Sequence, residues 1–374
     1  MRSMRTVRRL LYRDIVWSVA FVAVAFLSLF FFIDFVEELE AIGRDGYTLW
    51  HAVARSLLEL PGHFYELFPI AVLIGTIYAM ARLAQSSEFT ILRTAGLGPG
   101  RALWMLAIPG LWFAVLTFVV GDFVTPLTER EAVLIKAGAK GLSLGGSGAW
   151  LKERRRAGQD DERSVSVNVA ATAPGGELRG VRIFEFDRDG RLRTRIQADA
   201  ATVRSDGTWL LHRAERTEWP TPEASRDEAG LIHTSQASLR WASTLDASVV
   251  SAALLPLQTM STLELWRYSG HLTDQDQAAQ RHEIQFWKKA LYPFACVVMV
   301  ALALPFAYLH ARAGGVSFKV FGGIMLGISF VLLNNVSGYL GVLKQWTPWM
   351  VAAAPSALYL LLSMAAFAWL VRYR

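Results

Sequence analysis

The chain has 374 residues, of which 53% are hydrophobic, and its formal net charge is +6. A soluble protein of this size normally has a lower apolar fraction, so the composition argues against a wholly soluble chain. Cys296 is the only cysteine, which excludes an intrachain disulfide, and we interpret it as a small buried apolar residue.

The apolar residues gather in long runs that contain almost no charge. Most of these runs approach the roughly 20 residues needed to cross about 30 Å of hydrocarbon. The run at 67–81 is short, but it extends back through Phe64 and Tyr65 across the single charge of Glu66. We therefore predict six membrane spans, at residues 15–33, 67–81, 102–121, 290–309, 320–343 and 346–371.

Basic residues mark one side of the predicted membrane. They occur in the N-terminal MRSMRTVRR, in the loops at 82–101 and 310–319, and at the C-terminus, whereas residues 34–66 are mostly acidic. The positive-inside rule then predicts that both termini are cytoplasmic and that the first span is retained. Because this topology accounts for the positive charge, we expect no nucleic-acid binding.

Residues 141–260 have a different pattern. Apolar and polar residues alternate in SVSVNV and in VRIFEFDRDGRLRTRI, and Asp189-Gly190 and Asp206-Gly207 are strong hairpin signals. We predict an antiparallel β domain on the side opposite the basic loops, with Phe184 and Phe186 in its interior. The predicted organisation is three spans in 1–140, the β domain in 141–260 and three spans in 261–374.

Motifs for catalysis or metal binding are missing from the sequence. It contains no GxxxxGK[ST] phosphate loop, and GGSGAWLK lacks the required lysine and hydroxyl residue. HExxH and CxxC are also missing, and the histidines have no metal-ligand spacing. We therefore expect no catalytic residue, no metal and no cofactor of its own. The nearly uncharged spans also argue against an ion-coupled carrier and favour lipid transport or a structural role.

The fifth predicted span contains GGIMLGISF, which places Gly323 and Gly327 four residues apart. Small residues at this spacing let two membrane helices approach closely. We interpret them as helix-packing positions.

The stretch LAQSSEFTILRTAGLGPGR, residues 83–101, predicts a short cytoplasmic helix at about 86–96. Glu88 lies in its first turn, where the helix dipole favours an anion, and Phe89 and Leu92 form an apolar stripe before a glycine stop. Such a helix can lie on the lipid surface, pack against its own spans, or dock into a groove of a soluble partner. With Arg93 as its only basic residue, a lipid-surface role is the weakest of the three.

The block LELPGHFYELFPIAVLIGTIYAMARLAQSSEFTILRTAGLG resembles the LptF/LptG permease family of the lipopolysaccharide-export ABC transporter. The similarity extends to FVEELEAIG, to the exit from the third span at Gly121-Asp122 and Pro126, and to STLELWRYSGHL and QFWKKALYPF. It covers essentially the whole chain. The segment with STLELWRYSGHL and QFWKKALYPF, and GISF in the fifth span, are closer to the LptG branch than to the LptF branch.

The resemblance implies a six-span permease with an inserted periplasmic β-jellyroll, in the inner membrane of a Gram-negative bacterium. It implies a heterodimer with an LptF-type permease, whose first and fifth spans enclose a lipid cavity, and an LptB-type ATPase dimer that binds the ATP. LptC- and LptA-type proteins would receive the lipopolysaccharide. Glu88 matches the acidic position of the family's coupling helix, and Phe89, Leu92 and Arg93 belong to the same helix.

The chain departs from the family at the outer end of the first span, where some members carry lysines that meet lipopolysaccharide phosphates. Asp34 stands at the first such position and would repel phosphate, so this contact cannot be transferred. Arg44, Lys136 and Lys140 are the cations available instead, and Lys136 matches an arginine in a relative. They are equally well interpreted as solvated interface charges.

Two other functions fit the sequence. The chain can be the LptF-type half, or a permease for a related lipid. Alternatively, it can be a membrane scaffold that does not transport and binds a periplasmic partner through its β domain. The scaffold needs no cytoplasmic ATPase, so the presence or absence of that partner separates the two classes.

Overall fold

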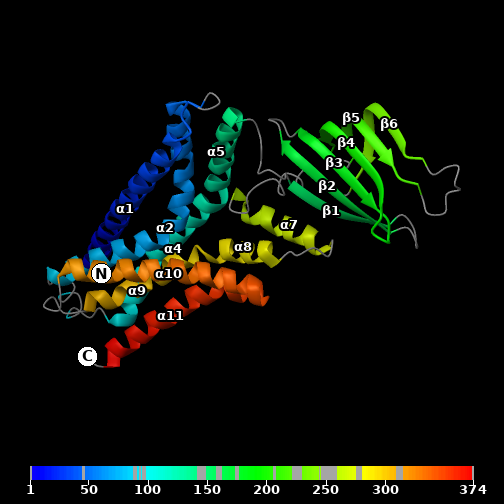
Figure 1. Ribbon diagram of the computed structural model, residues 1–374. Coiled ribbons are helices and arrows are strands. Elements are labelled where there is room, and N and C mark those ends of the chain that lie inside the picture. The colour runs from blue at the N-terminus through cyan, green and yellow to red at the C-terminus, as the bar shows by residue number, and fades with distance from the viewer. Residues whose placement is uncertain are drawn as a thin grey trace. The chain divides into compact units, whose positions relative to one another are not determined.

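The computed structural model divides into two compact units (Figure 1). We call residues 1–42, 48–132 and 280–374 the membrane unit, and residues 43–47 and 133–279 the β unit. The described residues are 2–43, 47–86, 91, 94, 98–140, 149–156, 162–172, 177–204, 208–220, 230–243, 245, 259–274, 280–308 and 315–372.

The membrane unit is built from long helices that contain all six predicted apolar runs. Five of these helices are long and apolar enough to cross a membrane, and the pair α8 and α9, which bends by 52° at its break, makes a sixth when the two helices are counted as one span. The predicted six-span arrangement is thus confirmed for the described residues. The helices are α1 (Arg2–Leu39), α2 (Leu49–Gln85), α4 (Pro99–Val119), α5 (Thr125–Lys140), α8 (Gln280–Leu291), α9 (Phe294–Tyr308), α10 (Val316–Lys344) and α11 (Pro348–Arg372).

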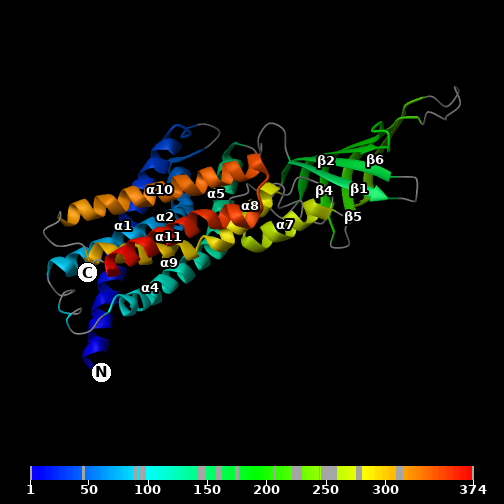
Figure 2. The same cartoon turned by 90° about the horizontal axis from the view of Figure 1, so that it is seen from below.

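Helix α2 forms the centre of the membrane unit. It contacts α1, α9 and α10 and contributes Leu73, Ile77 and other fully buried residues to the main apolar core (Figure 2). At Gly75 it comes so near to α1 that an added Cβ would lie 2.6 Å from the backbone N and Cα of Val19. Only glycine leaves room for this crossing, because any other side chain would meet backbone atoms.

The third span leaves regular α-helical geometry at η1 (Val120–Val124), a π-helical segment between α4 and α5. Pro126 follows it and has no N–H to offer the carbonyl four residues earlier, which favours a local change of hydrogen-bond pattern. The Tyr65 ring packs directly over Gly121 in this segment, so a Cβ there would clash with the ring. The irregular turn therefore makes space for an aromatic ring of α2.

The β unit contains one six-stranded antiparallel sheet, which confirms the predicted β domain. Among the described strands the order is β1 to β6 in sequence, a meander. Gly190 has a φ of +75° in the β3–β4 hairpin, as Asp189-Gly190 predicts, whereas Asp206-Gly207 lies outside the described residues. The strands are β1 (Ala149–Arg156), β2 (Glu162–Thr172), β3 (Leu178–Phe186), β4 (Leu192–Val203), β5 (Thr208–Glu218) and β6 (Ile232–Ala242).

One face of this sheet is buried, and it is not the face that carries the two predicted phenylalanines. On β3 the buried residues are Val181, Ile183 and Glu185, while Phe184 and Phe186 alternate with them and are partly exposed. The prediction of Phe184 and Phe186 in the interior is therefore wrong. The alternation is real, but both faces of β3 carry apolar residues, so the pattern alone selects the wrong face.

A further helix, α7 (Thr262–Asp274), follows the sheet in the β unit. It begins with a reciprocal cap, in which the Ser261 backbone N–H donates to Glu264 Oε2 at 2.8 Å and the Glu264 N–H donates to Ser261 Oγ at 3.3 Å. This arrangement satisfies donors that the helix itself leaves free and fixes its first residue.

Candidate functional site

The predicted coupling helix lies between α2 and α4, and the structure describes only part of it. Helix α2 ends at Gln85 with Ser86 as its C-cap, and α4 begins at Pro99. Between them Ile91 and Thr94 are helical and exposed, and Thr94 Oγ1 donates to the Ile91 carbonyl at 2.9 Å. The predicted contact residues Glu88, Phe89, Leu92 and Arg93 lie outside the described residues.

An ion pair joins α1 and α2 at the end of the membrane unit that bears this segment. Arg82 Nη2 lies 2.6 Å from Asp14 Oδ2, and the aspartate is largely buried while the arginine is exposed. The pair therefore fastens the last turn of α2 to the neighbouring helix just before the coupling segment begins.

Helix α1 presents two apolar faces with different environments. Leu11, Ile15 and Val19 follow one another at four-residue spacing and are buried against the rest of the unit. On the other side Trp17 is 71% exposed and Phe21 is 76% exposed. Apolar side chains this exposed need either lipid or a protein partner around them.

Helix α10 has the same two-sided character. Gly323 and Gly327 are buried against α2, where an added Cβ would lie 2.6 Å from Ile77 Cδ1 and 2.5 Å from Ile70 Cγ2, respectively. Their small-residue spacing thus serves close packing between α10 and α2. The opposite side of α10 is apolar and exposed and includes Phe318, which is 72% exposed.

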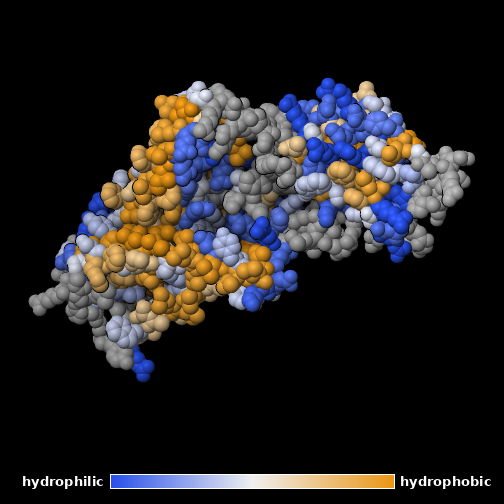
Figure 3. Space-filling view, in the orientation of Figure 1, coloured by the Kyte–Doolittle hydropathy of each residue, from blue (hydrophilic) through white to orange (hydrophobic). Residues whose placement is uncertain are grey.

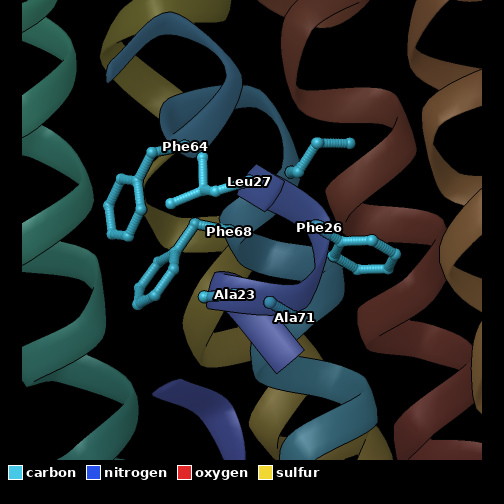
Figure 4. A pocket seen from close by; sticks show the side chains of 7 residues that line it. Ala23, Phe26, Leu27, Phe64, Phe68 and Ala71 are labelled. Carbon is cyan, nitrogen blue, oxygen red and sulfur yellow. The ribbon is translucent and has the colours of Figure 1, made fainter. Parts of the chain in front are cut away.

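A small apolar crevice, with a free volume of about 10 Å³, lies between α1 and α2 (Figure 4). Ala23, Phe26 and Leu27 line it from α1, and Phe64 and Phe68 are among the residues that line it from α2. The Phe64 and Phe68 rings stack with their centroids 4.4 Å apart. The lining contains no polar side chain, so the crevice suits a hydrocarbon group and disfavours an ion.

Charged residues connect α1 and α2 beyond this crevice. Asp34, the residue that departs from the family pattern, pairs with His63, with 2.8 Å between Asp34 Oδ2 and His63 Nε2. Both side chains are mostly buried. Asp34 therefore has a partner within its own subunit and is not an open site for an anion.

Arg55 forms the second connection between these helices. It pairs with Glu38 of α1, and its Nη2 lies 2.7 Å from Glu59 Oε1 of α2. The Glu38 side chain is only 9% exposed and that of Arg55 17%, so this group is far better shielded from solvent than the Arg82–Asp14 pair. Such shielding strengthens the attraction between the charges.

Farther along α2, the carboxylate of Glu129 from α5 packs against Gly62, with Oε1 2.5 Å from the position that a Cβ would take. Its electrostatic neighbours are Lys289, Glu66, Glu59 and His63. Glu129 Oε2 is buried and has no hydrogen-bond partner among the described residues. The half of the membrane unit away from the coupling segment therefore contains a cluster of charges of both signs.

The predicted phosphate contacts are placed only in part. Arg44 lies outside the described residues. Lys136 and Lys140 belong to α5, four residues apart, which places them on the same face of the helix. In the described part of the chain, no group of three or more His, Cys, Asp or Glu residues is arranged to hold a metal ion.

Sequence reasoning missed the charged connections between α1 and α2, although a signal is present. Asp34 and Glu38 are four residues apart on one helix, and Arg55, Glu59 and His63 are spaced by four on the next. Two polar stripes at helical spacing, of partly opposite charge and on consecutive helices, are typical of an interhelical ion-pair ladder.

The surfaces of the two units differ in hydropathy (Figure 3). The visible face of the membrane unit carries broad hydrophobic areas over its long helices, and the visible face of the β unit is mostly hydrophilic. This contrast fits helices that need an apolar surrounding and a sheet that faces water.

Comparison with known proteins gives the same assignment along the whole chain. Residues 9–372 match the family model described as lipopolysaccharide export system permease LptF/LptG. The chain is 27% identical to the lipopolysaccharide export system permease protein LptG of Haemophilus influenzae over 366 residues, 96% of each chain. It is 25% identical to the LptG protein of Escherichia coli K12 over 345 residues, 90% of this chain and 91% of the relative. The chain belongs to the LptF/LptG family of lipopolysaccharide export permeases.

Proposed function

We propose that this chain is the LptG-type half of the transporter that extracts lipopolysaccharide from the inner membrane. Family membership makes it a multi-pass permease subunit of the lipopolysaccharide export system. The observation that carries the proposal is the extent of the match, which includes the apolar helices and the inserted β unit together. The curated relatives are LptG proteins, which favours the LptG-type half over the LptF-type half.

The exposed apolar faces of α1 and α10 support a role as walls of a lipid cavity shared with an LptF-type permease. Trp17 and Phe21 on α1 and Phe318 on α10 are each more than two-thirds exposed in the isolated chain. Acyl chains can lie against such a surface without meeting a charged group.

The energy for extraction comes from a partner ATPase of the LptB type. The sequence contains no phosphate loop, so ATP binding and hydrolysis belong to another subunit. The segment between α2 and α4 is the part that the ATPase grips, and its movement reaches the spans through α2 and the Arg82–Asp14 pair. Closure of the ATPase dimer then narrows the cavity and expels the acyl chains.

Both termini and the coupling segment lie in the cytoplasm, and the β unit lies in the periplasm. The basic residues of the short loops support this orientation. The β unit passes the lipid towards LptC- and LptA-type proteins. Arg44, Lys136 and Lys140 are the cations proposed to meet its phosphates, because Asp34 is occupied by His63.

The experiment that tests this function is reconstitution with LptF- and LptB-type subunits in proteoliposomes and measurement of lipopolysaccharide release with and without ATP. Glu88→Ala should lower both ATPase co-purification and ATP-dependent release about tenfold, because a charge-assisted contact contributes roughly 1.5–3 kcal/mol. Thr94→Ala, in the same segment, is the matched control and should retain both activities. Normal co-purification and normal release by Glu88→Ala would refute the coupling role.

A further inference from the structure

The outer face of the sheet in the β unit, opposite its buried core, carries an exposed aromatic pair. The Trp150 and Phe184 rings stack with centroids 5.9 Å apart and an interplanar angle of 21°. Phe184 is partly buried by this contact, but 53% of Trp150 remains exposed. An edge-strand tryptophan in this state has an open ring face next to solvent.

Strand register places two arginines beside this pair. Trp150 of β1 is opposite Asn168 of β2, which is opposite Arg182 of β3. Phe184 of β3 is opposite Arg195 of β4. Because paired residues share a face of the sheet, Trp150 of β1, Arg182 and Phe184 of β3, and Arg195 of β4 lie on one face, within about 14 Å across the four adjacent strands β1 to β4. We call these four residues the Trp150 patch.

The arginines of the Trp150 patch lack the acidic partners that other arginines of the same sheet have. Arg193 is paired with Asp187 at 2.8 Å, and Arg213 with Asp199 at 2.7 Å. Arg182 and Arg195 are exposed, and neither forms an ion pair within the described residues; Arg195 donates to the neutral side chain of Gln197 at 3.0 Å.

Two guanidinium groups on neighbouring strands repel one another, so the patch favours an anion that bridges them. Guanidinium groups bind phosphate and carboxylate through paired hydrogen bonds, and exposed tryptophan and arginine are the residues most enriched at binding surfaces. The patch therefore combines an anion-binding part with a flat apolar part. Acyl chains would not use the arginines, and a small free anion would not use the ring.

We propose that the Trp150 patch binds the anionic sugar portion of the transported lipopolysaccharide. A sugar ring lies against the indole of Trp150, and Arg182 and Arg195 bind its phosphate or carboxylate groups. The inference rests on the proposed transport function and adds to it a saccharide contact on the outer face of the β unit. The hydrophilic end of the substrate is thereby held where water can reach it.

The test measures binding of core oligosaccharide, freed from its lipid by mild acid, to the intact transporter complex in lipid nanodiscs. Isothermal titration calorimetry gives the Kd, and dephosphorylated oligosaccharide is the second probe. Trp150→Ala should raise the Kd about tenfold and Arg182→Gln about fivefold, in line with stacking and charge-assisted contacts at an exposed site. Trp150→Phe should retain most of the affinity, and the dephosphorylated probe should bind more weakly and be insensitive to Arg182→Gln.

Arg240→Gln is the matched control, because it removes one exposed arginine from β6 at the other edge of the same sheet. Its Kd should stay within about twofold of the wild-type value. The proposal is overturned if the wild-type complex does not bind the oligosaccharide, or if the patch variants bind it as the wild type does. It is also overturned if these variants lose a periplasmic protein partner while keeping saccharide affinity, since the patch would then be a protein-docking surface.

Release of lipopolysaccharide by the wild-type complex is measured on the same preparation. Absence of ATP-dependent release would contradict the transport function itself. Normal release combined with unchanged saccharide binding by the variants would contradict the saccharide contact alone. Unchanged thermal midpoints of the variants verify that the β unit is folded.

Discussion

Helices α1 and α2 are both apolar enough to span a membrane, yet they occupy opposite environments. In the most apolar stretch of 18 residues in α2, 78% of the residues are buried inside the subunit, whereas in the corresponding stretch of α1 only 11% are. The mean hydropathy of these stretches is 1.8 for α2 and 2.6 for α1, so the more hydrophobic helix is the more exposed one. In a bilayer, apolarity therefore marks contact with lipid or lipid-like ligands, and burial depends on small residues and shape.

The same substitution on the two helices should separate these environments most clearly. Phe68 of α2 is 4% exposed and packs edge-on against Phe113, with 5.7 Å between centroids. Phe68→Ala should lower the free energy of unfolding by about 3 kcal/mol, because it leaves a cavity in a packed core. Phe21→Ala on α1 should change it by less than about 0.5 kcal/mol, because Phe21 loses only exposed contacts.

The measurement is the thermal midpoint of the purified complex, combined with lipopolysaccharide release in proteoliposomes. Phe21→Ala should reduce release while leaving the midpoint unchanged, if the exposed face of α1 touches substrate. Equal loss of stability in the two variants would show that α1 is as tightly packed in the assembled transporter as α2.

The second contrast concerns glycines of α2 and α10. Gly75→Ala brings a methyl group to 2.6 Å from the Val19 backbone, so we expect a loss of about 2 kcal/mol from forced separation of α1 and α2. Gly322→Ala places its methyl at an ordinary 3.6 Å from Phe306 and should be neutral or stabilising by about 0.5 kcal/mol, because alanine favours helix more than glycine does. Thermal midpoints of the two variants provide the check. An unchanged midpoint for Gly75→Ala would mean that α1 and α2 can move apart at this crossing without loss of stability.

Periodicity explains which parts of this fold can be predicted from sequence. The apolar runs predict the spans, and period-two alternation with Asp189-Gly190 predicts the sheet and one of its hairpins. The spacing of Gly323 and Gly327 predicts close packing, and the structure adds that the partner helix is α2. Each of these features is local in the chain, so a short window of sequence contains it.

Features that depend on contacts between residues far apart in the chain could not be predicted from a short window of sequence. The Asp34–His63 pair joins residues 29 positions apart, and nothing in either helix alone specifies the partner. The buried face of β3 was also out of reach, because Val181 and Ile183 compete with Phe184 and Phe186 for the interior. Gly180, with a φ of +61°, interrupts the pairing of β2 and β3, so the alternation of buried and exposed residues along β3 is harder to read from the sequence.

Two ion pairs between α1 and α2 differ in how well they are shielded from solvent. Arg55→Ala removes the arginine that pairs with the mostly buried Glu38, and we expect a loss of about 1.5 kcal/mol. Arg82→Ala breaks a pair whose arginine is 56% exposed, so its loss should stay below about 0.5 kcal/mol. Thermal midpoints of the two variants at low and high salt concentration distinguish the two pairs, since salt should weaken only the exposed pair. The reverse order of effects would contradict the assigned shielding.

The smallest effect is expected in the β3–β4 hairpin, where the interacting charge is half-buried at a surface turn. The Arg191 backbone N–H donates to Asp187 Oδ1 at 2.8 Å and, with help from Arg193, holds the pKa of Asp187 below its ordinary value. Because this pKa is lowered on folding, the contribution is complete above the ordinary aspartate pKa and is lost as the pH falls through the lowered value.

Asp187→Asn should therefore speed hydrogen–deuterium exchange at residues 187–193 by only about twofold at neutral pH. The difference from wild type should vanish in acid, after correction for intrinsic exchange. Asp189→Asn, in the same turn, is the control and should show no such pH dependence. A large effect at neutral pH would mean that this carboxylate at a surface turn stabilises the hairpin as strongly as a fully buried group does.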